Sequence, residues 1–300
     1  MAKLFSKNII RPEDVLAFLM ILPSIWVARQ PEYYYLLNGN IVMSKHLTGF
    51  LLLLVLAIVT ALYENRIQRI IDTIRSGVKI PQVGMDDQLI HLWKTKYRIL
   101  QVARDYLPFL ICIVAYHSLQ SIMPQFGSYR LDDSFIYVEK LLVEPWRTHV
   151  INWFSNITDF KTLMTIAYKT YILSVPILAG YLYMVKDLQK FRNFLLAVVL
   201  GSIIALLINA VLPSMSLDSH SRQLIGAYNG TVSLPAVYST VVLFFAFKIG
   251  KTLGLTFVPL AVLSFMAELL TYSNYLTAVL IGFILGALAV PLAKYIGGKF

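Results

Sequence analysis

A polar loop between two apolar segments contains side chains that could do acid–base chemistry. Asp218, His220 and Arg222 fall within five residues of one another, next to serines at 216, 219 and 221. Histidine titrates near neutral pH and a neighbouring carboxylate can orient its ring, so His220 and Asp218 are candidates for a general base and its orienting partner. A solvated loop in which Asp and Ser cap turns has the same composition, and this plainer interpretation is favoured.

Two ionisable residues, Lys169 and Glu268, lie inside apolar segments. Burying a charge in hydrocarbon is costly, so each is a candidate for ligand binding or transport. The structural alternative is that the two side chains pair with each other inside a helix bundle. Both interpretations remain open from the sequence.

The elements that position these residues must be membrane helices. The chain has 300 residues, of which 58% are hydrophobic and 14% charged, and its mean hydropathy is +0.68; soluble domains have about 25% charged residues. The net charge of +10 fits basic cytoplasmic loops, and we expect no nucleic-acid partner. The one cysteine, Cys112, excludes an intramolecular disulfide, and the spacing of the histidines predicts no metal and no cofactor.

Apolar runs predict about eight transmembrane helices in one polytopic, all-α integral membrane bundle. The expected spans are 14–28, 47–63, 106–123, 162–184, 194–212, 236–250, 255–271 and 276–293. Between the second and third spans, amphipathic stretches predict interfacial helices. Lys and Arg fall mainly in segments on one side of this arrangement, which predicts a multi-pass protein with both termini in the cytoplasm.

From about residue 104 onward, three segments occur in the order and spacing of a known family. They are Arg104-Asp105-Tyr106-Leu107-Pro108, Val138 to Leu142 followed by Glu144-Pro145-Trp146, and Tyr168 to Pro176. Together they resemble the type 2 phosphatidic acid phosphatase superfamily, in the branch that includes inositol phosphorylceramide synthases. The resemblance implies a six-helix phosphatase-like core over 104–300. Residues 1–103 then supply two further transmembrane helices and the cytoplasmic interfacial helices.

The same resemblance implies a histidine nucleophile with an aspartate four residues later, and a second histidine as the leaving-group acid. The nucleophile element corresponds to Asn274-Tyr275-Leu276-Thr277-Ala278 with Gly282. Tyr275 and Gly282 match the family, whereas Asn274 and Ala278 replace the histidine and the aspartate. An amide cannot attack phosphorus, so the expected nucleophile is absent from its family position.

The element that carries the leaving-group acid in the family is also altered. It corresponds to Leu234-Pro235-Ala236-Val237-Tyr238, where Ala236 replaces a serine and Tyr238 replaces the histidine. A phenol with a pKa near ~10 is a poor acid. Glu268 stands where many members carry a phosphate-binding arginine, and its carboxylate would repel phosphate.

These substitutions predict a catalytically degenerate member of the superfamily that binds a lipid or lipid-linked headgroup, or acts as a subunit of a membrane complex. The expected partners are membrane lipids, including a lipid phosphate or a lipid-linked sugar. The alternatives are an active phosphatase or phosphotransferase that uses residues such as His220 and Asp218, and a transporter of lipids or small solutes. The candidate binding residues are Lys169, Arg222, Tyr238, Glu268, Asn274 and Tyr275.

Overall fold

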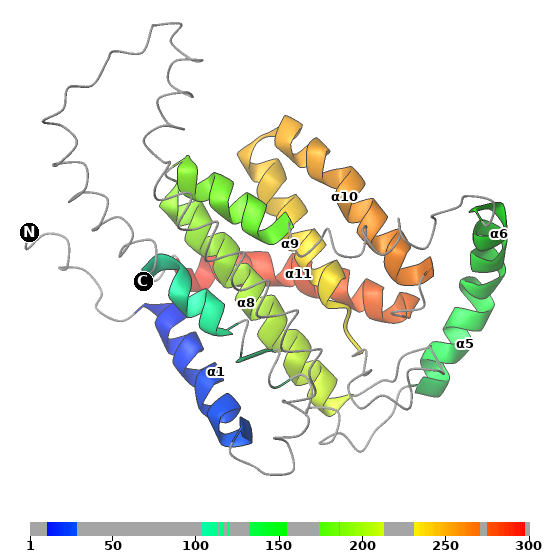
Figure 1. Ribbon diagram of the computed structural model, residues 1–300, viewed down its shortest axis with the longest axis horizontal. Helices are drawn as coiled ribbons and strands as arrows, with labels where there is room; N and C mark the ends of the chain where they lie inside the picture. The colour runs from blue at the N-terminus through cyan, green and yellow to red at the C-terminus, as the bar shows by residue number, and fades with distance from the viewer. Residues whose placement is uncertain are drawn as a thin grey trace, which may run out of the picture.

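The computed structural model describes residues 11–28, 104–112, 115–116, 119, 132–154, 174–185, 187–212, 231–270 and 275–297. Every regular element in these ranges is an α-helix (Figure 1), so the predicted all-α class is confirmed for this part of the chain. The second predicted span, 47–63, and the interfacial helices that follow it lie outside the described residues.

Four helices form the central bundle: α8 (Leu188–Val211), α9 (Leu234–Ile249), α10 (Lys251–Leu270) and α11 (Leu276–Gly297). Among the helices of the described ranges, α8, α10 and α11 are long and apolar enough to cross a membrane. The helix Ser174–Met184 and α9 are shorter apolar helices. This composition indicates a membrane-embedded helical protein.

Helix α8 begins six residues before its predicted start at 194, because the local capping signal lies earlier than the apolar run. Asp187 is the N-cap, and its carboxylate accepts a hydrogen bond of 3.1 Å from the backbone N–H of Lys190. This acceptor satisfies one of the free amides at the helix start. The helix is apolar on all sides and lies inside the bundle, as its many buried residues show.

Helix α9 packs closely against α11 because two glycines four residues apart on α11 remove side chains from the contact. A Cβ added to Gly282 would lie 2.5 Å from the carbonyl oxygen of Ser233, and one added to Gly286 would lie 2.7 Å from that of Val237. Real Cβ atoms essentially never come this close. Small residues at this spacing are a common device for close approach of membrane helices.

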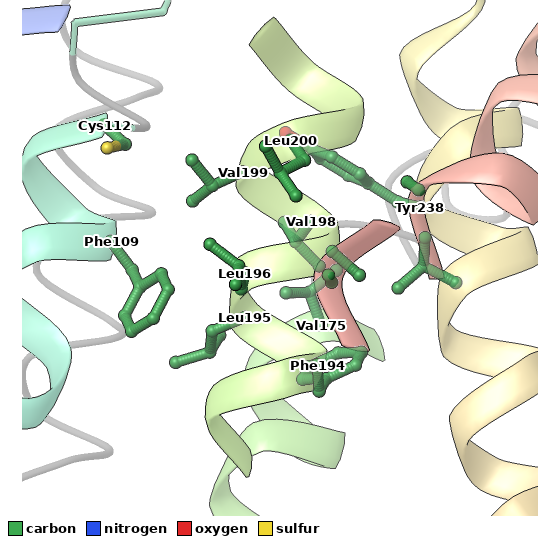
Figure 2. Close-up of a cluster of buried hydrophobic side chains, with 14 of the residues drawn as sticks. Phe109, Cys112, Val175, Phe194, Leu195, Leu196, Val198, Val199, Leu200 and Tyr238 are labelled. Atoms are coloured by element: carbon green, nitrogen blue, oxygen red, sulfur yellow. The ribbon is translucent and has the colours of Figure 1, made fainter. Parts of the chain in front are cut away.

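On the other side of the bundle, aromatic side chains attach the helix over 104–112. The Tyr106 ring lies 4.9 Å from that of Phe191 in α8 and 5.7 Å from that of Tyr183, measured between ring centroids. In Figure 2, Phe109 and Cys112 approach α8 from the side opposite to Tyr238 of α9. The face of α8 that contacts α9 is therefore separate from the face that contacts the 104–112 helix.

Helix α1 (Pro12–Ala28) joins this side through ion pairs at its first turn. Arg11 Nη1 lies 2.6 Å from Asp105 Oδ1, and Arg192 Nη2 lies 3.6 Å from the same oxygen. Glu13 lies 3.9 Å from Arg192. These contacts tie the beginnings of α1, the 104–112 helix and α8 together at one end of the bundle.

Helices α5 (Asp132–Leu142) and α6 (Glu144–Phe154) follow one another with only Val143 between them. We call residues 132–154 the α5–α6 rod. In Figure 1 the rod stands at the edge of the molecule and lies across the end of α11, with α10 reaching it from above. Contacts of α5 with α11 and of α6 with α10 confirm this placement.

Candidate functional site

The beginnings of α9 and α11 meet at the end of the bundle next to the α5–α6 rod. The backbone N–H of Ser233, directly before α9, donates a 3.0 Å hydrogen bond to the carbonyl oxygen of Ala278 in the first turn of α11. Glu268, in the last turn of α10, contacts Ser233 as well. The candidate site is therefore built from the beginnings of α9 and α11 and the end of α10.

Ser233 and Glu268 form the polar centre of this site. The Ser233 hydroxyl donates a hydrogen bond to Oε2 of Glu268, and its oxygen accepts a 3.2 Å hydrogen bond from the backbone N–H of Ala236. Ser233 is thus the N-cap of α9, and both residues are 1% exposed. A helix N-terminus carries partial positive charge, so a carboxylate at the position of Glu268 interacts favourably with the beginning of α9.

Tyr238 lies one turn further along α9 and links it to α8. Its hydroxyl oxygen is 2.8 Å from Oγ of Ser202. Since the Ser202 hydroxyl also donates to the carbonyl oxygen of Val198 over 2.8 Å, the consistent arrangement has Tyr238 donating to Ser202. This hydrogen bond satisfies the phenol within the bundle.

Ala236 and Ala278 have buried methyl groups beside this polar centre. The two residues are 3% and 0% exposed. Ala236 packs with Leu269 and Val279, and Ala278 packs with Tyr275 and Phe135. Neither methyl group can transfer a proton or attack a substrate, so the side chains at these two positions contribute packing alone.

The α5–α6 rod holds α10 and α11 through a buried ion pair, which we call the Glu139–Arg147 clip. Arg147 Nη2 contacts Glu139 Oε1, and the two residues are 1% and 3% exposed. Arg147 Nε also donates to the carbonyl oxygen of Leu269 over 2.7 Å, and Glu139 Oε2 accepts from the backbone N–H of Leu276 over 3.0 Å. The cation therefore lies at the C-terminal end of α10 and the carboxylate at the N-terminal end of α11. Each charge is opposite in sign to the partial charge of the helix end that it meets, so both interactions are favourable.

Tyr275, directly before α11, is anchored by the same rod. It is 2% exposed, and its ring meets that of Phe135 edge to face at a centroid distance of 5.6 Å. The Tyr275 side chain is thus part of the packing between the rod and α11.

Several predicted site residues lie outside the described part of the chain. They are Lys169, Asp218, His220, Arg222 and Asn274. The pairing of Lys169 with Glu268 and the relocated base therefore stay predictions.

The structure adds Ser233, Ser202 and Arg147 to the residues identified from the sequence. Ser233 precedes Leu-Pro, and a serine just before a proline in the first turn is an N-cap signal. The spacing of Phe135, Glu139 and Val143, at intervals of four, marks the buried face of α5. No comparable signal distinguishes Ser202, because it occurs within a uniformly apolar helix.

Two other kinds of site can be assessed in the described ranges. There, no group of three or more His, Cys, Asp or Glu side chains is arranged to hold a metal ion.

A small hollow between α9, α10 and the helix Ser174–Met184 is lined by Ser174, Ser239, Val242, Leu243, Phe257, Leu260 and Ala261. None of these side chains is ionisable, so the hollow lacks acid–base chemistry of its own.

Comparisons of this chain with protein-family models, with curated proteins and with solved structures find no match. The fold and the site thus define a broad class, a membrane-embedded helical protein with a buried polar cluster where three helix ends meet.

Proposed function

We propose that the protein is a catalytically inactive member of the lipid-phosphate phosphatase and phosphotransferase superfamily. It spans the membrane several times with both termini in the cytoplasm. It binds a lipid or lipid-linked headgroup, or serves as a subunit of a membrane complex.

The hydrogen bond between Glu268 and Ser233 carries this proposal. Phosphate sites commonly use the amides and positive end of a helix. In this protein the buried carboxylate of Glu268 already lies near the start of α9, where it is hydrogen-bonded to the N-cap residue Ser233. A phosphate brought to the same place would meet a like charge in a medium of low dielectric constant, where repulsion is strong.

The neighbouring substitutions support the same conclusion. Ala236 and Ala278 are buried methyl groups, and Tyr238 is hydrogen-bonded to Ser202. Catalysis of phosphate transfer needs a nucleophile and a positioned acid, and removing even one member of such a unit costs orders of magnitude in rate.

The Glu268 carboxylate also limits the kinds of headgroup that suit the site. An anionic oxygen accepts hydrogen bonds and attracts cations, so it suits a headgroup that carries hydroxyl or ammonium groups. Of the expected ligands, a lipid-linked sugar therefore fits this site better than a phosphate monoester.

The test compares turnover with lipid retention in the purified, full-length protein. Phosphate release and headgroup transfer are measured on lipid phosphates in nanodiscs, and lipids that co-purify are identified by mass spectrometry. We expect release no faster than from empty nanodiscs, together with a lipid enriched over the host membrane extract. Glu268→Gln should lose this lipid, whereas Thr256→Ala, at an exposed position, should retain it.

The rival functions give different results in these assays. Turnover that disappears in His220→Ala would establish an active enzyme and overturn the proposal. Uptake of solute by proteoliposomes that depends on Lys169 and Glu268 would establish a transporter. If another protein co-purifies in fixed stoichiometry and no lipid is enriched, the protein acts as a subunit of a membrane complex and does not act by binding a lipid.

A further inference from the structure

The hollow between α9, α10 and the helix Ser174–Met184 brings two hydroxyl groups into an otherwise apolar setting. Ser174 and Ser239 line it together with five apolar residues, and the two serines are 5% and 6% exposed. They come from different helices, so a molecule bound in the hollow would contact both. The candidate site at Ser233 and Glu268 uses neither of them.

The hollow lies near the middle of the membrane. Its α10 residues, Phe257, Leu260 and Ala261, fall in the central turns of the candidate span Lys251–Leu270. At a rise of ~1.5 Å per residue, Leu260 is about 15 Å from both ends of this helix, and the hydrocarbon core is ~30 Å thick. Bulk water and lipid headgroups do not reach this depth, so a hydroxyl here depends on the protein or on a bound molecule for its hydrogen bonds.

Ser239 lines the hollow without a hydrogen-bond partner from the described part of the chain. Ser202 and Thr240, for comparison, each donate over 2.8 Å to the carbonyl oxygen four residues earlier in their own helix. A buried hydroxyl that lacks a partner costs free energy. An occupant that can form hydrogen bonds is therefore favoured in the hollow over an apolar one.

The size of the hollow limits what this occupant is. The space open to a water-sized sphere is about 10 Å³, close to the ~10–15 Å³ that one ordered water molecule requires. A lipid chain would place an apolar methylene there, which offers no hydrogen bond to either serine. A water molecule both donates and accepts hydrogen bonds, so it can satisfy the two hydroxyl groups at once.

Ser264 provides a contrast within the same pair of helices. It lies about one turn along α10 from Ala261, toward Glu268, and is 1% exposed. Its Oγ has no hydrogen-bond partner in the described ranges, and it is not among the residues that line the hollow. Ser239 and Ser264 are thus two buried serines of which one lies beside a water-sized space and the other is enclosed by protein.

We propose that the hollow binds one structural water molecule, which forms hydrogen bonds with Ser174 and Ser239 in the membrane interior. This water joins α9 to the helix Ser174–Met184 through interactions that hydrocarbon cannot replace. The inference depends on membrane embedding and goes beyond the proposed function, because it holds whether or not Glu268 binds a headgroup.

Hydroxyl-radical footprinting of the full-length protein in phosphatidylcholine nanodiscs tests the proposal. X-ray pulses split water into radicals that oxidise neighbouring side chains, so a bound water marks its surroundings even where bulk water is absent. Phe257 lines the hollow and is 7% exposed. Phe194 and Phe245 are the controls, since they are 0% and 3% exposed and pack against each other at a centroid distance of 5.4 Å without lining the hollow. Water enriched in oxygen-18 identifies the source of the added oxygen.

Mass spectrometry should find Phe257 oxidised several times faster than either control, with oxygen-18 incorporated. Ser239→Val, which removes a hydroxyl and fills the hollow, should reduce the oxidation of Phe257 to the level of the controls. Ser264→Ala should leave it unchanged. Oxidation of Phe257 no faster than that of Phe194 would show that an apolar group fills the hollow and would overturn the proposal. Equally fast oxidation of Phe257 in Ser239→Val would overturn it as well.

A second measurement applies if Ser239→Val does not fold. Ser239→Ala removes a hydroxyl that bonds to the proposed water, whereas Ser264→Ala removes one that has no partner in the described ranges. Ser239→Ala should therefore lower the unfolding temperature in nanodiscs, and Ser264→Ala should leave it unchanged or raise it. A loss no larger in Ser239→Ala than in Ser264→Ala would contradict the bound water.

Discussion

Glu268 accepts a hydrogen bond from Ser233, and Ser233 in turn caps α9 by accepting one from the N–H of Ala236. A carboxylate near the end of one helix thereby stabilises the beginning of another. The arrangement depends on the hydroxyl, which donates to Glu268 and accepts from Ala236 at the same time. Without this hydroxyl, the N–H of Ala236 loses its capping acceptor and Glu268 loses one hydrogen-bond donor.

Ser233→Ala should therefore destabilise the protein by about 1–3 kcal/mol, since it removes a helix cap and the hydrogen bond that the hydroxyl donates to the buried Glu268. Thermal unfolding in detergent is the measurement. Thr256→Ala is the control, because it deletes a hydroxyl whose hydrogen bond, 2.7 Å long to the carbonyl oxygen of Leu253, lies at an exposed site. Equal losses in the two variants would show that the Ser233 hydroxyl has no special role.

The Glu139–Arg147 clip should behave as a coupled pair. Arg147→Met alone leaves Glu139 buried without its cation and should cost about 3–5 kcal/mol, and Glu139→Leu should also destabilise the protein, because it removes a buried counter-ion of Arg147. The double variant should recover a large part of the loss, because no unpaired charge remains. A double-mutant cycle on thermal stability tests this, and strictly additive losses would mean that the two charges do not interact.

Gly282→Ala should destabilise the contact between α9 and α11. The new methyl group would lie 2.5 Å from the carbonyl oxygen of Ser233, so backbone must shift, at a cost of about 1–3 kcal/mol. Gly250→Ala is the control, since nothing lies within 4 Å of its Cβ position. Unfolding temperatures of both variants in detergent provide the comparison, and an unchanged Gly282→Ala would argue against the close approach.

Asp187 should show a pH-dependent contribution to stability. The hydrogen bond from the Lys190 side chain lowers the pKa of the Asp187 carboxyl. Because the pKa is lower in the folded state, the contribution is complete above the unfolded value of ~3.9 and is lost as the pH falls through the folded value. Asp187→Ala should cost about 1 kcal/mol at neutral pH through loss of the N-cap.

The measurement is the difference in unfolding temperature between Asp187→Ala and the unaltered protein. This difference should shrink as the pH is lowered below about 4. Asp187→Asn retains an acceptor for the N–H of Lys190 but cannot ionise. At neutral pH, Asp187→Asn should therefore lower the unfolding temperature by less than Asp187→Ala does. An Asp187→Ala deficit that stays constant down to acid pH would contradict the assigned role of the carboxylate.

Apolar runs were sufficient to predict the helices at 236–250, 255–271 and 276–293, because the property that marks a membrane helix is its own composition. The boundaries were less accurate where a cap decided them, as at Asp187, which starts α8 before its apolar run begins.

The contacts of the candidate site were harder to foresee because they join residues far apart in the sequence. Glu268 could be recognised as a buried carboxylate, but its partner Ser233 lies 35 residues away on another helix. Arg147 is 1% exposed and bonds to α10. Its four-residue spacing from Val143 and Glu139 marks a buried face, but that spacing does not identify the distant helix end that the charge meets.

The ion pairs of Arg11, Glu13, Asp105 and Arg192 also set an order of events during synthesis. Arg11 is already present when Asp105 is made, so α1 and the 104–112 helix can pair early. Arg192 is made 87 positions after Asp105, which takes roughly 4–17 s at common translation rates. During that time α8 is absent, so Asp105 can pair with Arg11 while Glu13 and Asp105 both lack Arg192.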